Sequence, residues 1–403
     1  MNSVPLFVGI DYSDGFVQLC AEDECGKVRV NRPCRNDWRE LVKAVEGKGT
    51  VKRAAIEACS GAADLAEELI THAGWHVELG HPHYVAKLKG SPDKTDFTDA
   101  HLIADLTRVG YLPRTWLPPA YIRDLRQLVG YRQQLVDERR AMKLRTGALL
   151  REHRVRTPAK MSRWTKAWIT FARYTEQLSE HARWIINQTL DQVVELDRRV
   201  AQAEGRLRLA TSADAVIEKL MKQQGVGEVT AWVLRAFIGT FDRFNTGKQL
   251  SRYCGLSPKN ASSGMKQADG GLIKFSNKIL RATLIQAAHR LIRTSDRWSK
   301  LAGSLLQRGK PKCVIVAAVA NRWMRRMFHE MNVGLRPTPR DLSHQATGSQ
   351  GTSSKMTCAA TEDKALLGSN PSAATTPNGR DGPATVGPSC RCAGGPKRKI
   401  LGS

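Results

Sequence analysis

Long apolar runs are missing from this chain. No run of apolar residues approaches the roughly 18–20 that a helix needs to span a bilayer. Residues 1–7 also lack the basic stretch followed by an apolar core that marks a secretory signal. We therefore expect no membrane insertion and a cytoplasmic location.

Paired cysteines are missing too. The 9 cysteines are scattered, without a CxxC motif or a Cys/His cluster of the zinc type. Cys20, Cys59, Cys254 and Cys313 lie among apolar residues, so we expect them to be small core residues. A structural zinc site is not expected.

Acidic residues are scarce relative to basic ones. The 403-residue chain has 38 Asp and Glu against 63 Lys and Arg, a formal net charge of +25. Such an excess favours a polyanionic partner, usually nucleic acid, with an acidic membrane surface as the competing partner. The length allows two or three domains of roughly 100–200 residues each.

The first part of the chain, 1–115, alternates strand and helix patterns. Strand patterns cover 6–11, 16–21, 27–31, 51–58 and 75–79, and helical patterns cover 37–45, 61–73 and 96–106. Three strands followed by alternating helices and strands predict an α/β domain of ribonuclease H-like (RuvC-like) order. The proline-containing segment 113–119 then reads as a linker.

The remainder is predicted to be mostly helical. Residues 116–212 have the apolar spacing of long amphipathic helices, which pair either as a hairpin within one chain or as a coiled coil between two chains. Residues 213–334 form a second compact, mostly helical domain. Residues 335–403 are polar and poor in aromatics, so we expect a disordered tail.

Four acidic residues stand out by position. Asp11 and Glu57 each end an apolar strand, where a carboxylate is costly to bury without compensation. Asp96 and Asp99 lie three apart at the start of a predicted helix, on one face. Acids favoured by the helix dipole are the alternative for this pair. If the helix packs over the strands, all four converge, and oxygen-only ligands of this kind favour Mg²⁺ or Mn²⁺.

A Gly225-Val226-Gly227 turn opens a predicted helix in the C-terminal half. Such a turn resembles the hairpin of helix-hairpin-helix modules, whose backbone N–H groups can hold a phosphate. The alternative is a tight turn between two helices.

A serine-containing basic loop follows. Ser262 and Ser263 precede Gly264, and a serine in this setting can attack a phosphate if a base, a metal or cations activate it. The cations that could hold the phosphate are Lys266, Lys274, Lys278 and Arg281. An ordinary solvent loop is the alternative, because Ser-Ser-Gly is common in loops.

These motifs occur in a specific order. Gly9-Ile10-Asp11, Glu57, and 94–100 (Lys-Thr-Asp-Phe-Thr-Asp-Ala) precede 225–227 (Gly-Val-Gly), 253–258 (Tyr-Cys-Gly-Leu-Ser-Pro), 262–264 (Ser-Ser-Gly) and 280–281 (Leu-Arg). In this order, over about 7–330, the chain resembles the DEDD transposases of the insertion-sequence 110 family, 1111 subgroup.

The resemblance implies a RuvC-like N-terminal domain whose four acids are Asp11, Glu57, Asp96 and Asp99. It implies a C-terminal transposase domain whose serine attacks DNA, and Ser263 matches best, with Ser262 as its neighbour. It also implies a structured bridge RNA that pairs with donor and target DNA, and homodimers that assemble into tetramers.

The expected function is thus movement of an insertion sequence by DNA cleavage and exchange, with element ends and target DNA as substrates. Arginines at positions 123, 126, 132, 139 and 140 are expected to bind the nucleic-acid backbone. Two alternatives stay open: a Holliday-junction-type nuclease or DNA invertase, and an inactive nucleic-acid-binding remnant.

Overall fold

The N-terminal part of the chain forms a six-stranded sheet with the order β3-β2-β1-β4-β5-β6. The computed structural model describes residues 3–88, 95–260 and 269–332. The strands are β1 (Pro5–Asp11), β2 (Phe16–Glu22), β3 (Val28–Arg35), β4 (Thr50–Glu57), β5 (Val77–Gly80) and β6 (Arg114–Thr115). β1, β2 and β3 form an antiparallel meander, whereas β1, β4 and β5 are parallel. The expected mixed α/β domain is confirmed.

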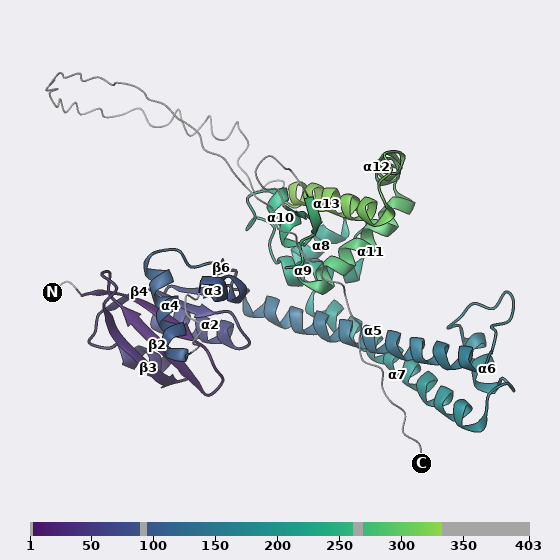
Figure 1. Ribbon diagram of the computed structural model, residues 1–403, viewed down its shortest axis with the longest axis horizontal. Helices are drawn as coiled ribbons and strands as arrows, with labels where there is room; N and C mark the ends of the chain where they lie inside the picture. Colours follow the sequence, from purple (N-terminus) through teal and green to yellow (C-terminus); the bar gives the residue numbers. More distant parts are fainter. Residues whose placement is uncertain (1–2, 89–94, 261–268, 333–403) are drawn as a thin grey trace, which may run out of the picture. The chain divides into compact units, whose positions relative to one another are not determined.

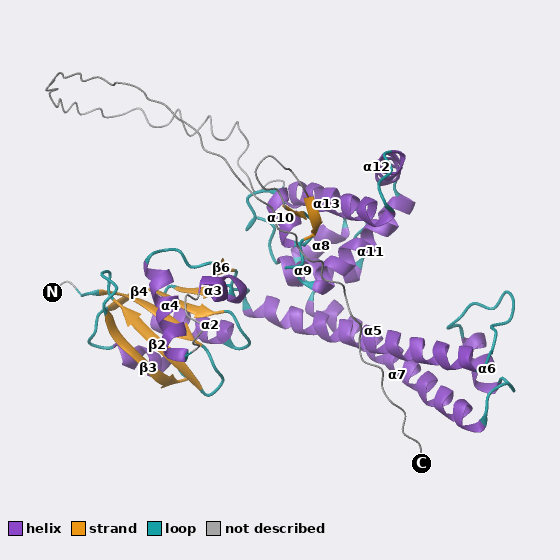
Figure 2. Ribbon diagram, in the orientation of Figure 1, coloured by secondary structure: helices purple, strands orange, loops and turns teal. Residues whose placement is uncertain are grey.

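Helices pack against this sheet because its central strands are apolar on both faces (Figure 2). The helices are α1 (Trp38–Val45), α2 (Ala62–Ala73), α3 (Pro82–Leu88) and α4 (Asp96–Arg108). On one face, Leu6 and Ile10 join a core with Leu41 of α1 and Leu69 of α2. On the other face, α4 packs over β1, β2 and β4.

The third strand is longer than its pattern predicts. It continues past position 31 to Arg35 and includes Pro33. Because β3 is an edge strand, the missing N–H of a proline need not break a ladder on its outer side. Helix α3 (Pro82–Leu88) and the two-residue strand β6 are not among the elements expected from the sequence.

A helical hairpin forms the middle of the chain (Figure 1). Its long arms are α5 (Ala120–Glu152) and α7 (Glu180–Ala210), which pack side by side, and α6 (Lys166–Tyr174) lies between them in sequence. Leu135 on α5 packs with Leu196 and Val200 on α7. The apolar seam predicted from the sequence is thus buried within a single chain.

The C-terminal part is mostly helical, as expected. It contains α8 (Ala215–Met221), α9 (Glu228–Ile238), α10 (Gly247–Tyr253), α11 (Lys278–Thr294), α12 (Asp296–Gln307) and α13 (Lys312–Met331), with a small sheet of β7 (Pro258–Asn260) and β8 (Asp269–Leu272). Buried residues of α9, α11 and α13 share one core, including Trp232, Leu284 and Trp323. All described residues fall in one compact unit, so the domain boundaries predicted from the sequence stay a prediction.

Two of the four cysteines expected in the core are not buried. Cys20 and Cys254 are buried as expected, but Cys59 and Cys313 are exposed. Cys59 lies in the loop between β4 and α2, and Cys313 lies in the first turn of α13, before the buried part of that helix begins at Ile315. Across the described ranges, no helix is long and apolar enough to cross a membrane.

Candidate active site

Asp11 and Glu57 stand at the same edge of the sheet. Ile10 is the register partner of Ile56 in the parallel pair of β1 and β4, and Asp11 and Glu57 are the next residues of each strand. Both side chains are half-buried. Two acids at neighbouring strand ends favour a shared cationic ligand, because each is costly to desolvate alone.

Asp96 and Asp99 lie in the first turn of α4, which begins with a capping box. Thr95 Oγ1 accepts the backbone N–H of Thr98 at 3.2 Å, and Thr98 Oγ1 accepts the N–H of Thr95 at 3.4 Å. This cap fixes which turn of the helix carries the two acids. Asp96 is exposed, but Asp99 is only 4% exposed. A favourable helix dipole accounts for an exposed acid such as Asp96 and does not explain a buried Asp99.

A glycine in β1 lets α4 lie directly on the sheet. A Cβ added to Gly9 would be 2.2 Å from the carbonyl oxygen of Ala100 and 2.3 Å from the backbone nitrogen of Ala104. Gly9 is two residues before Asp11, and Ala100 directly follows Asp99. The close approach therefore places the first turn of α4 near the ends of β1 and β4, the packing that convergence of the four acids needs.

The charge at this edge acts on a neighbouring thiol. Cys59 is exposed two residues after Glu57. Partial desolvation raises the pKa of the Cys59 thiol, and the carboxylates of Glu57, Asp11 and Asp14 raise it further. The ends of β1 and β4 therefore form one acidic environment.

The acidic groups fit a divalent metal by their chemistry, since carboxylate oxygens are the ligands that Mg²⁺ and Mn²⁺ prefer. Their side chains do not lie close enough together in this structure to coordinate one metal ion. Within residues 3–88, 95–260 and 269–332, no three His, Cys, Asp or Glu side chains are grouped so that they could hold a metal ion. A metal at this edge would have to draw Asp11, Glu57, Asp96 and Asp99 closer together.

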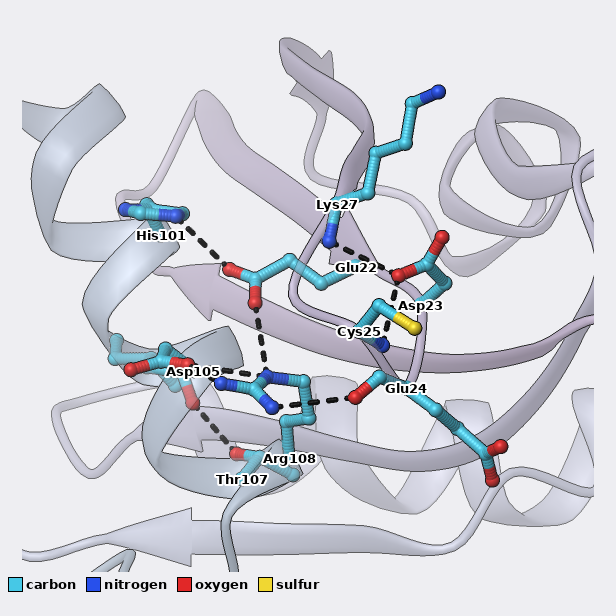
Figure 3. Close-up of polar contacts among 10 residues, drawn as sticks. Glu22, Asp23, Glu24, Cys25, Lys27, His101, Asp105, Thr107 and Arg108 are labelled. Carbon is cyan, nitrogen blue, oxygen red and sulfur yellow. Dashed lines mark hydrogen bonds and ion pairs between the residues drawn. The ribbon is translucent and has the colours of Figure 1, made fainter.

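A second buried acid lies under α4, and the sequence analysis missed it. Glu22, at the end of β2, is 1% exposed. Figure 3 shows its carboxylate between two basic side chains of α4: Oε1 is 3.2 Å from His101 Nε2, and Oε2 is 3.5 Å from Arg108 Nε. Arg108 also donates to Asp105 and to the carbonyl of Glu24. These contacts attach α4 to β2.

Burial raises the pKa of Glu22 to about 7, and the charge of Asp105 adds to the rise while Arg108 opposes it. The sequence signal that could have revealed Glu22 is the one used for Asp11 and Glu57, namely an acid that ends an apolar strand.

The serine loop lies outside the described residues, as do Ser262, Ser263, Gly264 and Lys266. The structure describes its two flanks, where β7 and β8 pair antiparallel with Asn260 opposite Asp269. At the base of this hairpin, Arg281 donates to the carbonyl of Ile273 at 2.9 Å. Lys274 and Lys278 are exposed nearby in sequence. Arg281 therefore has a structural contact, whereas the two lysines remain available to a phosphate.

The turn that leads into β7 is fixed by α13. Asn321 Nδ2 donates to Ser251 Oγ at 2.5 Å and to the carbonyl of Leu256 at 3.0 Å. Gly255, in this turn, has φ +70°, and a Cβ there would be 2.1 Å from Ser276 Oγ. The segment 253–258 thus anchors the start of the hairpin that carries the serines.

The Gly225-Val226-Gly227 turn has a packing role. Gly225 has φ +84°, and a Cβ there would be 2.6 Å from Leu291. Gly227 caps α9, and Glu228 at its first position pairs with Arg208 at 2.8 Å. An acid at this helix end repels a phosphate, so the geometry favours a tight turn over the expected phosphate-binding one.

Most of the hairpin arginines expected to bind nucleic acid have partners within the chain. Arg123 pairs with acids of α2, Arg132 pairs with Glu204 and Arg139 pairs with Asp197. Arg126 donates to the carbonyl of Ala236. Arg140 is exposed, and it has no ion pair with any described residue.

In comparisons with known proteins, each half of the chain matches a transposase family model. Residues 8–155 match the IS110-type DEDD model, described as "Transposase", and residues 217–302 match "Transposase IS116/IS110/IS902 family". A probable family 20 transposase of Pseudomonas aeruginosa is 28% identical over 275 residues, 66% of this chain and 80% of that protein. The transposase for insertion sequence element IS1111A of Coxiella burnetii is 26% identical over 306 residues, 75% of this chain and 83% of that protein.

Proposed function

The chain belongs to the IS110 family of DEDD transposases, and we propose that Asp11, Glu57, Asp96 and Asp99 form the metal-binding part of its active site. As a transposase for an insertion sequence, the enzyme cleaves and rejoins DNA. The observation that carries the proposal is the common edge reached by β1, β4 and the first turn of α4. A Mg²⁺ or Mn²⁺ ion held there supplies charge stabilisation for the scissile phosphate.

Ser263 is the proposed nucleophile, with Ser262 as the neighbouring candidate. Its Oγ forms a bond to the scissile phosphorus while the bond from phosphorus to the leaving sugar oxygen breaks, and that oxygen takes up a proton. Attack by a sugar hydroxyl on the phosphoserine link then rejoins the strands and restores the serine. Lys274 and Lys278 support this assignment, because they are exposed beside the hairpin that leads to the serines.

We further propose that a structured bridge RNA pairs with the donor and target DNA and so supplies the sequence choice. The net charge of +25 supports a nucleic-acid partner, because a strongly basic protein attracts a polyanion. A homodimer that assembles into a tetramer is the proposed working form, in which the acidic site and the serine of different subunits can meet.

The proposal is tested by trapping a protein–DNA adduct. The purified chain, with any co-purified RNA sequenced and added back, is incubated with Mg²⁺ and labelled DNA that carries the ends of the insertion sequence. Denaturing gels should show a covalent adduct with the unchanged chain and with Ser262→Ala, and none with Ser263→Ala or Asp11→Asn. Full cleavage by Ser263→Ala would instead indicate a nuclease of the junction-resolving type.

A further inference from the structure

A cavity of about 290 Å³ opens at the tip of the helical hairpin. Its walls come from the C-terminal half of α5, from the connection 153–165 and from α6. Its volume is close to the lower end of ligand-sized pockets, about 300 Å³. We call this cavity the tip pocket. None of the motifs assigned to the transposase chemistry contributes to it.

The tip pocket is basic. The basic residues that line it are Arg139, Arg140, Lys143, Arg151 and Arg163. No Asp or Glu is found among the described residues that line it. Arg139 is neutralised in part by Asp197, but the other four have no ion pair with a described residue. The pocket therefore has an excess of positive charge, whereas Arg132, Arg173 and Arg198 elsewhere in the hairpin each pair with an acid.

Aromatic rings form another part of the wall. Trp164 and Trp168 have ring centroids 4.5 Å apart with an angle of 50° between the planes. Trp168 is 1% exposed and donates from Nε1 to Thr157 Oγ1 at 3.1 Å, so it is fixed in the core. Trp164 is only half-buried, and Lys143 Nζ lies 5.1 Å from its ring centroid. Trp164 is thus partly exposed and next to a cation.

The backbone around this ring is strained. Trp164 has φ +70°, and Arg154 and Lys160 in the same connection have φ +55° and +65°. These are the only non-glycine residues with positive φ among those that the structure describes. Such conformations are costly and occur most often where a binding site needs them. Arg154 adopts this conformation in the turn that ends α5, whereas Trp164 adopts it in the turn before α6, where its side chain lines the tip pocket.

We propose that the tip pocket binds one unpaired nucleotide of the nucleic acid that this transposase handles. The base stacks on Trp164, and the flanking phosphates are held by Arg140, Lys143 and Arg163. Aromatic rings beside cations are the usual means of binding single strands, because every base has a stacking face and every linkage a charge. The inference rests on the proposed function for the presence of nucleic acid, and it adds a contact that distinguishes unpaired from paired strands.

Binding is measured with the full chain in EDTA, so that no cleavage occurs. Fluorescein-labelled single-stranded DNA, single-stranded RNA and a blunt DNA duplex of equal length are titrated by anisotropy at two salt concentrations. The variants are Trp164→Leu and Arg140→Gln. Their matched controls are Trp184→Leu, which changes an exposed tryptophan of α7, and Arg145→Gln, which changes an exposed arginine of α5 outside the pocket.

Trp164→Leu should weaken single-strand binding by about tenfold, the effect of losing one stacked base, and should leave duplex binding unchanged. Trp164→Phe should restore most of the loss. Arg140→Gln should make the plot of log binding constant against log salt concentration less steep, by the amount that one phosphate contact contributes. The controls should bind like the unchanged chain. Comparison of the affinities for single-stranded RNA and single-stranded DNA shows which of the two supplies the nucleotide.

Equal losses on single strands and duplex would overturn the proposal, as would wild-type binding by Trp164→Leu. Competition by polyglutamate as strong as that by an oligonucleotide of equal charge would also overturn it, because the pocket would then bind acidic chains in general. Melting curves of all variants identify any that fail to fold. If Trp164→Leu does not fold, Arg140→Gln still tests the proposal, because Arg140 is exposed. Because binding is measured without metal, it is independent of whether Asp11 or Ser263 supports cleavage.

Discussion

Gly9 of β1 and Ala100 of α4 are in backbone contact: a Cβ on Gly9 would lie 2.2 Å from the carbonyl oxygen of Ala100. The atoms that a side chain would meet belong to the helix backbone, so no rotamer change can relieve the clash. The first turn of α4, with Asp96 and Asp99, can be close to Asp11 and Glu57 only while this position has no side chain.

Gly9→Ala should therefore shift α4 away from the sheet and lower covalent adduct formation by about 100-fold, a loss that a misplacement of about 1 Å can cause. Gly15→Ala is the matched control, because a Cβ at Gly15 meets no atom within 4 Å. Both variants are compared in the adduct assay and in oligonucleotide binding. Equal activity of the two variants would show that the contact of α4 with β1 does not position the acids.

Glu22 should make stability depend on pH. Burial raises the pKa of Glu22 from its ordinary value of 4.5 to about 7 in the folded chain, so the folded state holds this proton more tightly than the unfolded state. The resulting stabilisation is present below about pH 4.5 and is lost as the pH rises through 7. Between pH 5 and 8 the loss is on the order of 2 kcal/mol.

Glu22→Gln should flatten this dependence, which urea unfolding at pH 5, 6.5 and 8 measures. Glu24→Gln, which changes a neighbouring exposed acid, is the control and should keep the wild-type slope. An unchanged slope for Glu22→Gln would mean that the contacts of Glu22 with His101 and Arg108 keep the carboxylate ionised in the folded chain.

Arg132 and Arg140 lie on the same helix and should have opposite roles. Arg132 is largely buried and pairs with Glu204 of α7 at 2.7 Å. Arg132→Ala should lower the free energy of unfolding by on the order of 1–2 kcal/mol. It should change the salt dependence of nucleic-acid binding little. Arg140→Ala should do the reverse, because its side chain is exposed. Thermal melting and salt-dependent binding of the two variants distinguish these roles.

Asn321 should affect the serine hairpin without contacting DNA. Its side chain connects Ser251 with the carbonyl of Leu256 at the start of the turn that leads to β7. Asn321→Ala should lower adduct formation by about tenfold, because the nucleophile is held less accurately, while oligonucleotide affinity stays near wild type. The control is Asn187→Ala on α7. A parallel loss of affinity in Asn321→Ala would indicate a general unfolding of the C-terminal part.

The position of Asp11 and Glu57 at one edge of the sheet could be predicted from the sequence, whereas the partners of the basic residues could not. Asp11 and Glu57 were found because a carboxylate at the end of an apolar strand is unusual, and the strand register places both at one edge. Glu22 carries the same signal at the end of β2. Its role depends on His101 and Arg108, which are distant in sequence and become neighbours only when α4 crosses the sheet.

The arginines were harder to interpret, because a charged residue on a long helix has the same pattern whether it meets solvent, DNA or an acid on another helix. Only the pairing of α5 with α7 decides that Arg132 and Arg139 have acidic partners, whereas Arg140 has no ion pair with any residue that the structure describes. The same holds for the tip pocket, since Lys143 and Trp164 come together only through the fold of the connection between α5 and α6.

The central proposal is that the ends of β1 and β4 and the first turn of α4 hold one divalent metal site. Titration of Mn²⁺ followed by electron paramagnetic resonance tests it directly, with the full chain and without DNA. The unchanged chain and Asp14→Asn, which alters an exposed acid nearby, should bind Mn²⁺ equally. Asp11→Asn and Glu57→Gln should lose most of that binding. Equal Mn²⁺ binding by all four proteins would contradict the proposed site.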